Sequence, residues 1–432
     1  MLSHARSGRA TLRVVSGLIA ALLLASCTPT TEQPLPTPTV ADPWAERGPI
    51  TLAGGGSPDA WDGLVQNWNS LHPNEPVTLV DLPTSANQRH AAIAERAQAN
   101  SGEYTVIALD VTWTAEFAKK GWLTELPPSR FPTDAMVPAA VASASWNDVL
   151  YAYPKSTDAG LLYFRQDLLS GAELGAPTTW RDLEATCSRL GRHGSMSCFG
   201  LSLTKDEPLT VAFVESTGAS GGQLITSAGL PSVDSMSAVA GLAWLADGVS
   251  GGVIAEDAMS WSEADAVRAF AEGKLVFLRG WATAGTVFDS ADPNTVVVGK
   301  TGVARLPGRM ALGPSVLGGE NLAISTFARN KGTAADFLAY VASDAAQRGL
   351  IEDASQGPVL SALYADAELV ARHPYLSVLQ SALGTAVARP VTVRYGEVTQ
   401  AIQEQASGAL RGERTAAQAM AELQSKLETL LK

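Results

Sequence analysis

Metal ligands and nucleophile motifs are scarce in this chain. Five histidines and three cysteines occur among its 432 residues, and no histidine stands at a ligand spacing from another, which argues against a zinc site. A G-x-S-x-G elbow is also missing, although the sequence leaves open a Ser-His-Asp triad assembled from distant residues. We therefore expect neither a metal nor a cofactor.

Basic residues are outnumbered by acidic ones. Lys and Arg number 31 against 43 Asp and Glu, which gives a net charge of −12. Nucleic acids and anionic lipid surfaces attract basic proteins, so both are poor partners for this chain. Removal of residues 1–26, argued next, takes away three arginines and no acidic residue, and it lowers the net charge to −15.

After the N terminus the sequence lacks any run that predicts a membrane span. At the N terminus, three arginines precede an apolar run from Val14 to Ala25, which is the order of a secretory signal and too short to cross a bilayer. The following "LASC" resembles a bacterial lipobox, so we expect cleavage after residue 26 and a lipid on Cys27. A buried helix with an incidental cysteine is the alternative. Residues 27–47 are rich in Pro and Thr and predict an extended tether outside the cell membrane.

The two remaining cysteines, Cys187 and Cys198, lie close together in the sequence. In an oxidising exterior such a pair favours a disulfide, with two unpaired buried thiols as the alternative. A mature chain of about four hundred residues exceeds what one hydrophobic core supports, so we expect two domains.

Two glycine motifs resemble phosphate-binding loops. "VVVGKTG" at 296–302 contains the Gly-Lys-Thr of a P-loop, but Asn294 replaces the earlier glycine and the next residues read as a strand rather than a helix. We interpret it as a chance match. "GGGSP" at 54–58 precedes a helix N terminus, where an anion or a sugar hydroxyl could bind, or where the glycines only form a turn.

The apolar pattern after residue 49 alternates between strands and helices. Short runs at 50–56, 76–83 and 104–109 predict strands, and periodic stretches after Ser57-Pro58 and over 87–99 predict the helices between them. This βαβαβ order predicts a parallel sheet with right-handed crossovers. Further strands are expected at 161–164, 275–281 and 318–325, and further helices at 180–190, at 262–273, from 333 and from 415.

Polar and aromatic residues follow two of the predicted strands. "VIALDVTW" passes from a buried run to Asp110 and Trp113, and "LVFLRGW" ends in Trp281. The carboxyl ends of strands in open α/β sheets carry ligand sites, and a carboxylate beside an indole suits a polyol with an apolar face. Each Trp could instead be a lid over the sheet edge, but the two together favour a binding cleft.

The order of motifs resembles the solute-binding lipoproteins of carbohydrate ABC importers, the group that includes the maltose-binding protein. The resemblance covers essentially the whole mature chain. It rests on the first βαβ unit and on "LDVTWTAEFAKKGWLTEL", "YAYPKSTDAGLLYFRQDLL", "PTTWRDLEATC", "AFAEGKLVFLRGW" and "GGENLAIS". A closer match is the family of trehalose-binding lipoproteins of actinobacterial importers, which shares "LDV-x-WTAEFA-x-x-GW", "GG-x-NLA" and an Arg-Pro pair ahead of a late Tyr.

This resemblance implies a set of sugar contacts. Two departures from the family pattern are Gln88, where the family has an acidic residue, and Thr157-Asp158, where it has a polar amide in the hinge-crossing strand. Both departures bear on the identity of the sugar rather than on the class. Arg389 has an alternative role as an interlobe salt bridge, and Asp110 and Glu263 as a helix cap or surface carboxylates. The implied substrate-binding residues are Asn87, Gln88, Asp110, Asp158, Glu263, Trp281, Gly319, Glu320 and Arg389.

The resemblance further implies a two-lobed α/β fold of the periplasmic-binding-protein type II, with a hinge and an interlobe cleft. Lobe 1 would comprise 48–155 and 318–360, and lobe 2 would comprise 156–317 and 361–432, with crossings near 154–158, 312–320 and 357–362. A monomer without enzymatic activity would capture an α-linked disaccharide, trehalose first, by closure and deliver it to the permease. The alternatives are a glycerophosphodiester or longer oligosaccharide, and a glycosidase that uses Asp110 and Glu263 as its carboxylate pair.

Overall fold

The computed structural model describes residues 42–55, 59–190 and 196–431. The predicted signal, the lipidation site Cys27 and most of the predicted tether lie outside these residues, as do Gly56, Ser57 and Pro58 of the glycine motif. Asp42–Lys432 forms one compact unit. Among its described helices, none is long and apolar enough to cross a membrane.

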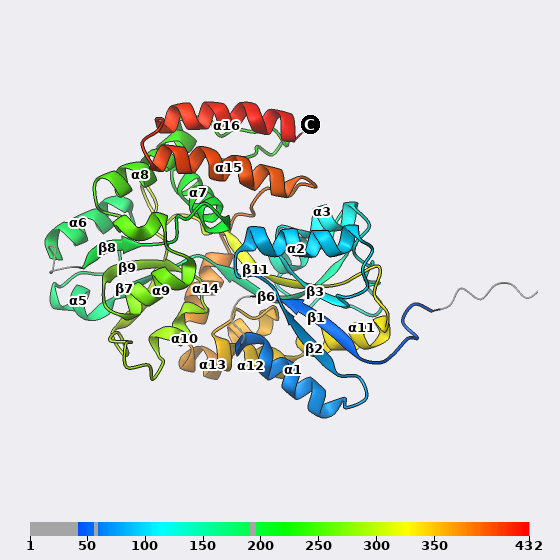
Figure 1. Ribbon diagram of the computed structural model, residues 1–432. Coiled ribbons are helices and arrows are strands. Elements are labelled where there is room, and N and C mark those ends of the chain that lie inside the picture. The colour runs from blue at the N-terminus through cyan, green and yellow to red at the C-terminus, as the bar shows by residue number, and fades with distance from the viewer. Residues whose placement is uncertain (1–41, 56–58, 191–195, 432) are drawn as a thin grey trace, which may run out of the picture. The chain divides into compact units, whose positions relative to one another are not determined.

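The first sheet has the strand order β2-β1-β3-β11-β6 (Figure 1). β1 pairs in parallel with β2 and β3, which confirms the predicted βαβαβ unit, whereas β11 runs antiparallel to both β3 and β6. The prediction of a parallel sheet is therefore right only for the first three strands. The bounds are β1 (Ile50–Gly54), β2 (Val77–Asp81), β3 (Val106–Asp110), β6 (Ala152–Ala159) and β11 (Leu317–Ile324).

The second sheet has the strand order β10-β7-β9-β8. β7 is antiparallel to both β10 and β9, and β8 is parallel to β9. Gly299-Lys300 leads directly into β10, so the P-loop-like motif precedes a strand, as predicted. The bounds are β7 (Leu161–Arg165), β8 (Ser197–Gly200), β9 (Leu275–Gly280) and β10 (Thr301–Arg305), and a separate hairpin pairs β4 (Ser145–Trp146) with β5 (Val149–Leu150).

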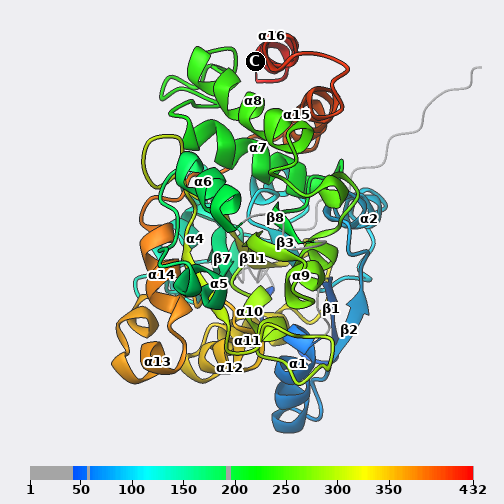
Figure 2. The same cartoon turned by 90° about the vertical axis from the view of Figure 1, so that its left-hand side faces the viewer.

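Helices cover both faces of each sheet because side chains alternate along the strands. In β3, Val106 and Ala108 join the core beneath α1, α11 and α12, while Ile107 and Leu109 join the core beneath α2 and α3. The second sheet likewise has α6, α7 and α8 on one face and α9, α10 and α14 on the other, and α15 and α16 pack against α7 and α8 (Figure 2). We call the first sheet with its helices lobe 1 and the second lobe 2.

The helices have the following bounds. They are α1 (Asp59–Leu71), α2 (Ala86–Gln98), α3 (Thr114–Lys119), α4 (Pro138–Ser143), α5 (Gln166–Gly171), α6 (Trp180–Leu190), α7 (Glu207–Ala219), α8 (Met236–Ser250), α9 (Glu263–Ala271), α10 (Ala284–Phe288), α11 (Lys331–Val341), α12 (Asp344–Ala354), α13 (Ala367–Arg372), α14 (Tyr375–Leu383), α15 (Tyr395–Leu410) and α16 (Ala416–Leu430). Two 3₁₀ helices are η1 (Glu256–Met259) and η2 (Ser361–Ala365).

The chain passes between the sheets near β6, the edge strand of the first sheet, and its neighbour β11. β6 belongs to the first sheet, and after Gly160 the chain continues as β7 of the second. It returns from β10 to β11. The segment at Gly357 also contacts β6 here, because the Thr157 N–H donates to the carbonyl of Gly357 at 3.0 Å. The lobe boundaries given above remain predictions.

Residues 42–47, assigned by the sequence to the end of the tether, lie on lobe 1. The indole of Trp44 has its centroid 5.9 Å from the ring of Phe131, and Arg47 Nη1 is 2.7 Å from Asp336 Oδ2. These residues are therefore part of the folded unit.

Cys187 at the end of α6 and Cys198 in β8 form a disulfide, with their Cα atoms 5.5 Å apart. The bond ties a lobe 2 helix to the edge strand of its sheet.

Candidate ligand-binding site

Asp110 and Trp113, which the sequence places at the end of β3, have different surroundings in the structure. Asp110 is the last residue of the strand, and its Oδ1 accepts hydrogen bonds from the backbone N–H and the hydroxyl of Thr112 at 2.9 and 2.7 Å. Trp113 turns inward instead: it is 3% exposed and packs beside His90 and Phe117 in the core beneath α2 and α3. The interpretation of Trp113 as part of a cleft is wrong, and Asp110 alone of the pair lies at the strand end with partial exposure.

Arg389 joins the lobes beside Asp110. Its Nη2 lies 3.0 Å from Asp110 Oδ1 on lobe 1, and its Nη1 lies 2.6 Å from Glu207 Oε1 at the start of α7. Glu207 also accepts hydrogen bonds from Tyr395 and Thr399. The structure thus gives Arg389 the interlobe ion pair that was the alternative to sugar binding, and its buried Nε–H has no partner among the described residues.

Burial and the neighbouring charges have opposite effects on the pKa values of Arg389 and Glu207. Burial alone would lower the pKa of Arg389, but the charges of Asp110 and Glu207 outweigh it and hold the pKa well above the ordinary value. Burial raises the pKa of Glu207, and the opposing attraction of Arg389 does not fully compensate. The guanidinium therefore stays charged and oriented between two carboxylates.

Trp281 and Glu263 meet on lobe 2. The indole Nε1 donates to Glu263 Oε1 at 2.7 Å, and the guanidinium of Arg279 lies 3.9 Å from the centre of the Trp281 ring. Arg279 is fixed in turn by a buried bidentate pair with Glu215, at 2.9 and 2.7 Å. Glu263, on the first residue of α9, keeps 45% of its side chain exposed. The half-buried indole is therefore held in one orientation by the exposed Glu263 at its edge and the buried Arg279 against its ring.

Asp158 supports Trp281 from the crossing strand β6. Its carboxylate accepts from the backbone N–H of Ala159 at 2.8 Å and of Ala282 at 3.2 Å. Because the group is buried, its pKa is raised to about 7, with the two backbone donors and Arg279 opposing the rise. Asp158 thus holds the turn after β9 in place. Its carboxylate is buried against this turn rather than exposed to a ligand.

Glu320 and Gly319 lie on β11, the strand between β3 and β6. Glu320 is paired in register with Asp110 on the neighbouring strand, and its Oε2 accepts from Lys155 Nζ at 2.9 Å. Gly319 adopts φ +116°, and an added Cβ would collide with the backbone of Ser156. Glycine is therefore required for the close packing of β11 on β6.

Asn87 and Gln88 begin helix α2. The Asn87 backbone N–H donates to Asp206 Oδ1 at 3.1 Å, and its side-chain amide donates to Gln403 Oε1 at 3.0 Å; both partners belong to lobe 2. Gln88 is exposed, and its N–H is taken by the helix cap Ser85.

The predicted residues form two groups linked by β11. Asn87, Asp110 and Arg389 share the first group, and Asp158, Glu263 and Trp281 the second. Gly318 of β11 packs against the Trp281 ring, since an added Cβ would lie 2.6 Å from Cζ3, and two residues along the strand Glu320 stands opposite Asp110. One strand step of two residues spans about 7 Å, so the two groups are neighbours.

Several residues of this region were not predicted from the sequence. Asp206 and Glu207 were readable in part, because Asp followed by Glu-Pro is the pattern of an N-cap with Pro in the first turn. Lys155, Arg279 and Gln403 carried no local signal. All three are buried polar residues whose partners come from distant parts of the chain.

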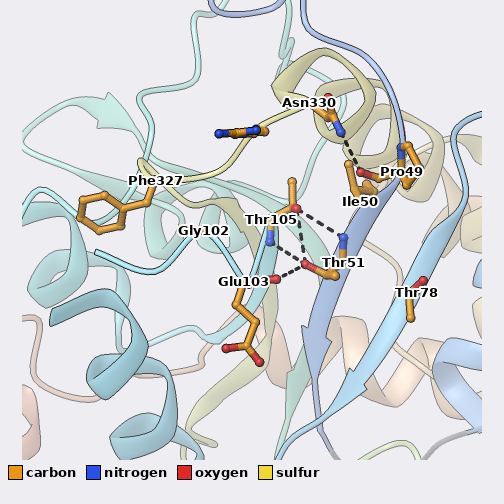
Figure 3. Close-up of a pocket in the computed structure, with 10 residues that line it drawn as sticks. Pro49, Ile50, Thr51, Thr78, Gly102, Glu103, Thr105, Phe327 and Asn330 are labelled. Atoms are coloured by element: carbon orange, nitrogen blue, oxygen red, sulfur yellow. Dashed lines mark hydrogen bonds between the residues drawn. The ribbon is translucent and has the colours of Figure 1, made fainter. Parts of the chain in front are cut away.

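A separate cavity of about 460 Å³ lies at the opposite edge of the first sheet (Figure 3). It is lined at the amino ends of β1 and β2 by Thr51 and Thr78, and across from them by Phe327 and Asn330. The Thr51 hydroxyl donates to the carbonyl of Glu103, accepts the backbone N–H of Thr105 and lies 3.4 Å from the Thr105 hydroxyl. None of the predicted site residues lines this cavity.

The chain belongs to the family described as bacterial extracellular solute-binding protein, whose model matches residues 54–348. It is similar to a probable ABC transporter-binding protein of Deinococcus radiodurans, with 28% identity over 358 residues that cover 79% of this chain and 82% of the relative. It is also similar in structure to maltose-bound T. maritima MalE3, with a TM-score of 0.84 and 29% identity over 88% of this chain and 99% of that chain.

A second solved structure supports the fold. The GacH receptor of Streptomyces glaucescens, solved unliganded and with acarbose, aligns with a TM-score of 0.80 at 24% identity over 89% of this chain and 98% of that chain. Together with the likeness to MalE3, this confirms the mixed α/β, two-lobed periplasmic-binding-protein fold predicted from the sequence.

Proposed function

We propose that this solute-binding protein captures a neutral α-linked disaccharide, trehalose first, between its lobes for an ABC importer. The observation that carries the proposal is the orientation of Trp281: a half-buried indole fixed by Glu263 and Arg279 beside the crossing strand. Such a ring offers an apolar face to the C–H side of a pyranose, and the exposed oxygen of Glu263 accepts hydroxyls. The similarity to maltose-bound MalE3 supports a sugar as the solute.

The charges near Trp281 and Asp110 favour a neutral ligand over a phosphodiester. The described cations of this region are buried and paired: Arg279 with Glu215, Arg389 with Asp110 and Glu207, and Lys155 with Glu320. A phosphate would have to compete with these carboxylates for the guanidinium groups, while Glu263 repels it. A neutral polyol does not compete with these carboxylates and can donate its hydroxyls to the exposed Glu263, so we place the glycerophosphodiester second.

Capture would proceed by closure of the lobes around the sugar and docking of the closed form on the permease. The proposed contacts remain those predicted from the sequence, with Asp158 and Gly319 acting through the residues they hold. We further propose a monomer anchored by a lipid on Cys27 outside the cell membrane. No bond is broken in this scheme, and no residue is assigned a catalytic role.

Calorimetry on residues 42–432 tests the proposal with trehalose, maltose, sucrose, cellobiose, glucose and glycerophosphocholine. Trp281→Ala should weaken binding of the preferred disaccharide by about 30-fold or more, the loss typical of a central aromatic anchor. Trp146→Ala, in the β4–β5 hairpin, is the matched control and should bind normally. If only glycerophosphocholine binds, the ligand is a phosphodiester and the sugar proposal is wrong. Glucose released after incubation would indicate a glycosidase.

The lipid anchor needs a separate test on the full-length protein. Expressed with its own N terminus in a bacterium, the wild-type chain should fractionate with membranes, and Cys27→Ala should be released in soluble form. Membrane association of both variants would contradict lipidation at Cys27.

A further inference from the structure

The first turns of two helices from different lobes share one carboxylate. Asp206 caps α7, and its Oδ1 accepts the backbone N–H of Glu207 at 2.8 Å. The same oxygen accepts the backbone N–H of Asn87, in the first turn of α2, at 3.1 Å. Each helix N terminus carries a partial positive charge, so a single negative side chain between them attracts both. In Figure 1 the start of α2 accordingly lies near α7.

The side chain of Asn87 makes a second contact with lobe 2. Its amide donates to Gln403 Oε1 at 3.0 Å. Gln403 is 2% exposed, and its own amide nitrogen donates to Thr399 and Thr210 at 3.0 and 3.3 Å. These two acceptors fix the amide nitrogen, so that the amide oxygen points at α2. Gln403 is therefore a rigid acceptor built into lobe 2.

The ion pairs of Arg389 converge on the same turn of α7. Glu207, next to Asp206, binds Arg389, which also binds Asp110 at the end of β3. The side chain of Arg389 is only 2% exposed, so solvent ions screen these pairs weakly. Both the helix-end contact and the ion pairs thus tie lobe 1 to the start of α7.

We propose that these contacts form a latch that holds the lobes closed without a bound ligand. The latch comprises Asn87, Asp110, Asp206, Glu207, Arg389 and Gln403. The proposal rests on the proposed function, since it concerns the closure step of solute capture. All its partners are protein groups, so they favour the closed state whether or not a sugar is present. Solute entry then requires the latch to open, and the fraction of time spent open limits the association rate.

Distance measurement between the lobes tests the latch without knowledge of the ligand. Spin labels at Leu71→Cys in lobe 1 and Met236→Cys in lobe 2 suit pulsed electron resonance, because these side chains are 66% and 91% exposed. The measurement uses residues 42–432, which form the compact unit described above. The native disulfide stays in place and leaves both labelling cysteines free.

The main variant is Asp206→Ala, which removes the shared carboxylate. Ser235→Ala is the matched control, because Ser235 caps α8 in the same lobe by accepting the Ala238 N–H, and among the described residues its hydroxyl bonds only groups of lobe 2. Should Asp206→Ala fail to fold by circular dichroism, Asn87→Ala serves instead, since it removes the Gln403 contact and leaves the cap intact.

Without sugar, wild type and Ser235→Ala should show one narrow distance that matches the structure. Asp206→Ala should lower the ratio of closed to open molecules by about tenfold, the worth of one charge-assisted contact. A wild-type protein that is mainly open without sugar, or an Asp206→Ala distribution equal to wild type, would overturn the latch. If the distances change as expected but no sugar in the panel binds, the latch is supported and the sugar proposal is refuted.

Discussion

The buried carboxylate of Asp158 makes the stability of the protein depend on pH in a predictable direction. Its Oδ atoms accept two backbone N–H groups, but burial raises its pKa from 3.8 to about 7. Asp158→Asn is the informative change, because the amide oxygen still accepts the Ala282 N–H while the side chain no longer ionises. The variant therefore separates the effect of charge from the effect of the hydrogen bond.

The expected magnitude follows from the difference between the two pKa values. In the unfolded chain Asp158 loses its proton near pH 3.8, whereas the folded protein keeps it until about pH 7. Between these values the folded state binds the extra proton, so its stability falls as pH rises, by about 1.4 kcal/mol per pH unit. The full loss is about 4 kcal/mol, of which about 3 kcal/mol falls between pH 5 and 8.

Urea unfolding of residues 42–432, followed by tryptophan fluorescence at pH 5, 6, 7 and 8, measures this effect. The free energy of unfolding of Asp158→Asn relative to wild type should rise by about 3 kcal/mol from pH 5 to pH 8. Asp134→Asn, an exposed carboxylate, is the control and should show no such trend. A constant difference between Asp158→Asn and wild type across this range would refute the reasoning.

Three further changes test the scaffold. Arg279→Met leaves the buried Glu215 carboxylate unpaired and should cost about 3–5 kcal/mol in urea unfolding, with Arg268→Met on the surface as control. Cys198→Ser opens the disulfide to Cys187 and should cost about 3 kcal/mol; an unchanged melting temperature would contradict this. Gly319→Ala forces a Cβ into the backbone of β6 and should lower the melting temperature, whereas Gly175→Ala, where a Cβ meets open space, should not.

Much of the fold could be predicted because burial leaves a local pattern in the sequence. β3 is a continuous apolar run because both of its faces are buried, and the apolar residues of α1 recur at helical spacing because one face of the helix is buried. The order of strands within a sheet has no such local trace. β11 joins β3 although more than two hundred residues separate them, and the antiparallel half of the first sheet was missed for that reason.

The candidate site was predictable only as far as local sequence determines side-chain position. The strand end at Asp110 and the capped start of α9 at Glu263 are local features, and both lie where expected. The direction of Trp113 depends on His90 and Phe117, and the packing of α2 on α3 turns this indole into the core. Arg389 binds Glu207 and Asp110, which stand 182 and 279 residues away, so no spacing rule indicated the pair.

The contacts of residues 42–47 have a mechanical consequence. Trp44 and Arg47 fasten the start of the folded chain to Phe131 and Asp336, all within lobe 1. A pull along the chain at Asp42 is thus borne by lobe 1 and does not pass through the strands β6 and β11 that join the lobes. Because lobe 1 alone bears this load, tension on the N-terminal chain neither strains nor releases the contacts of the latch between the lobes.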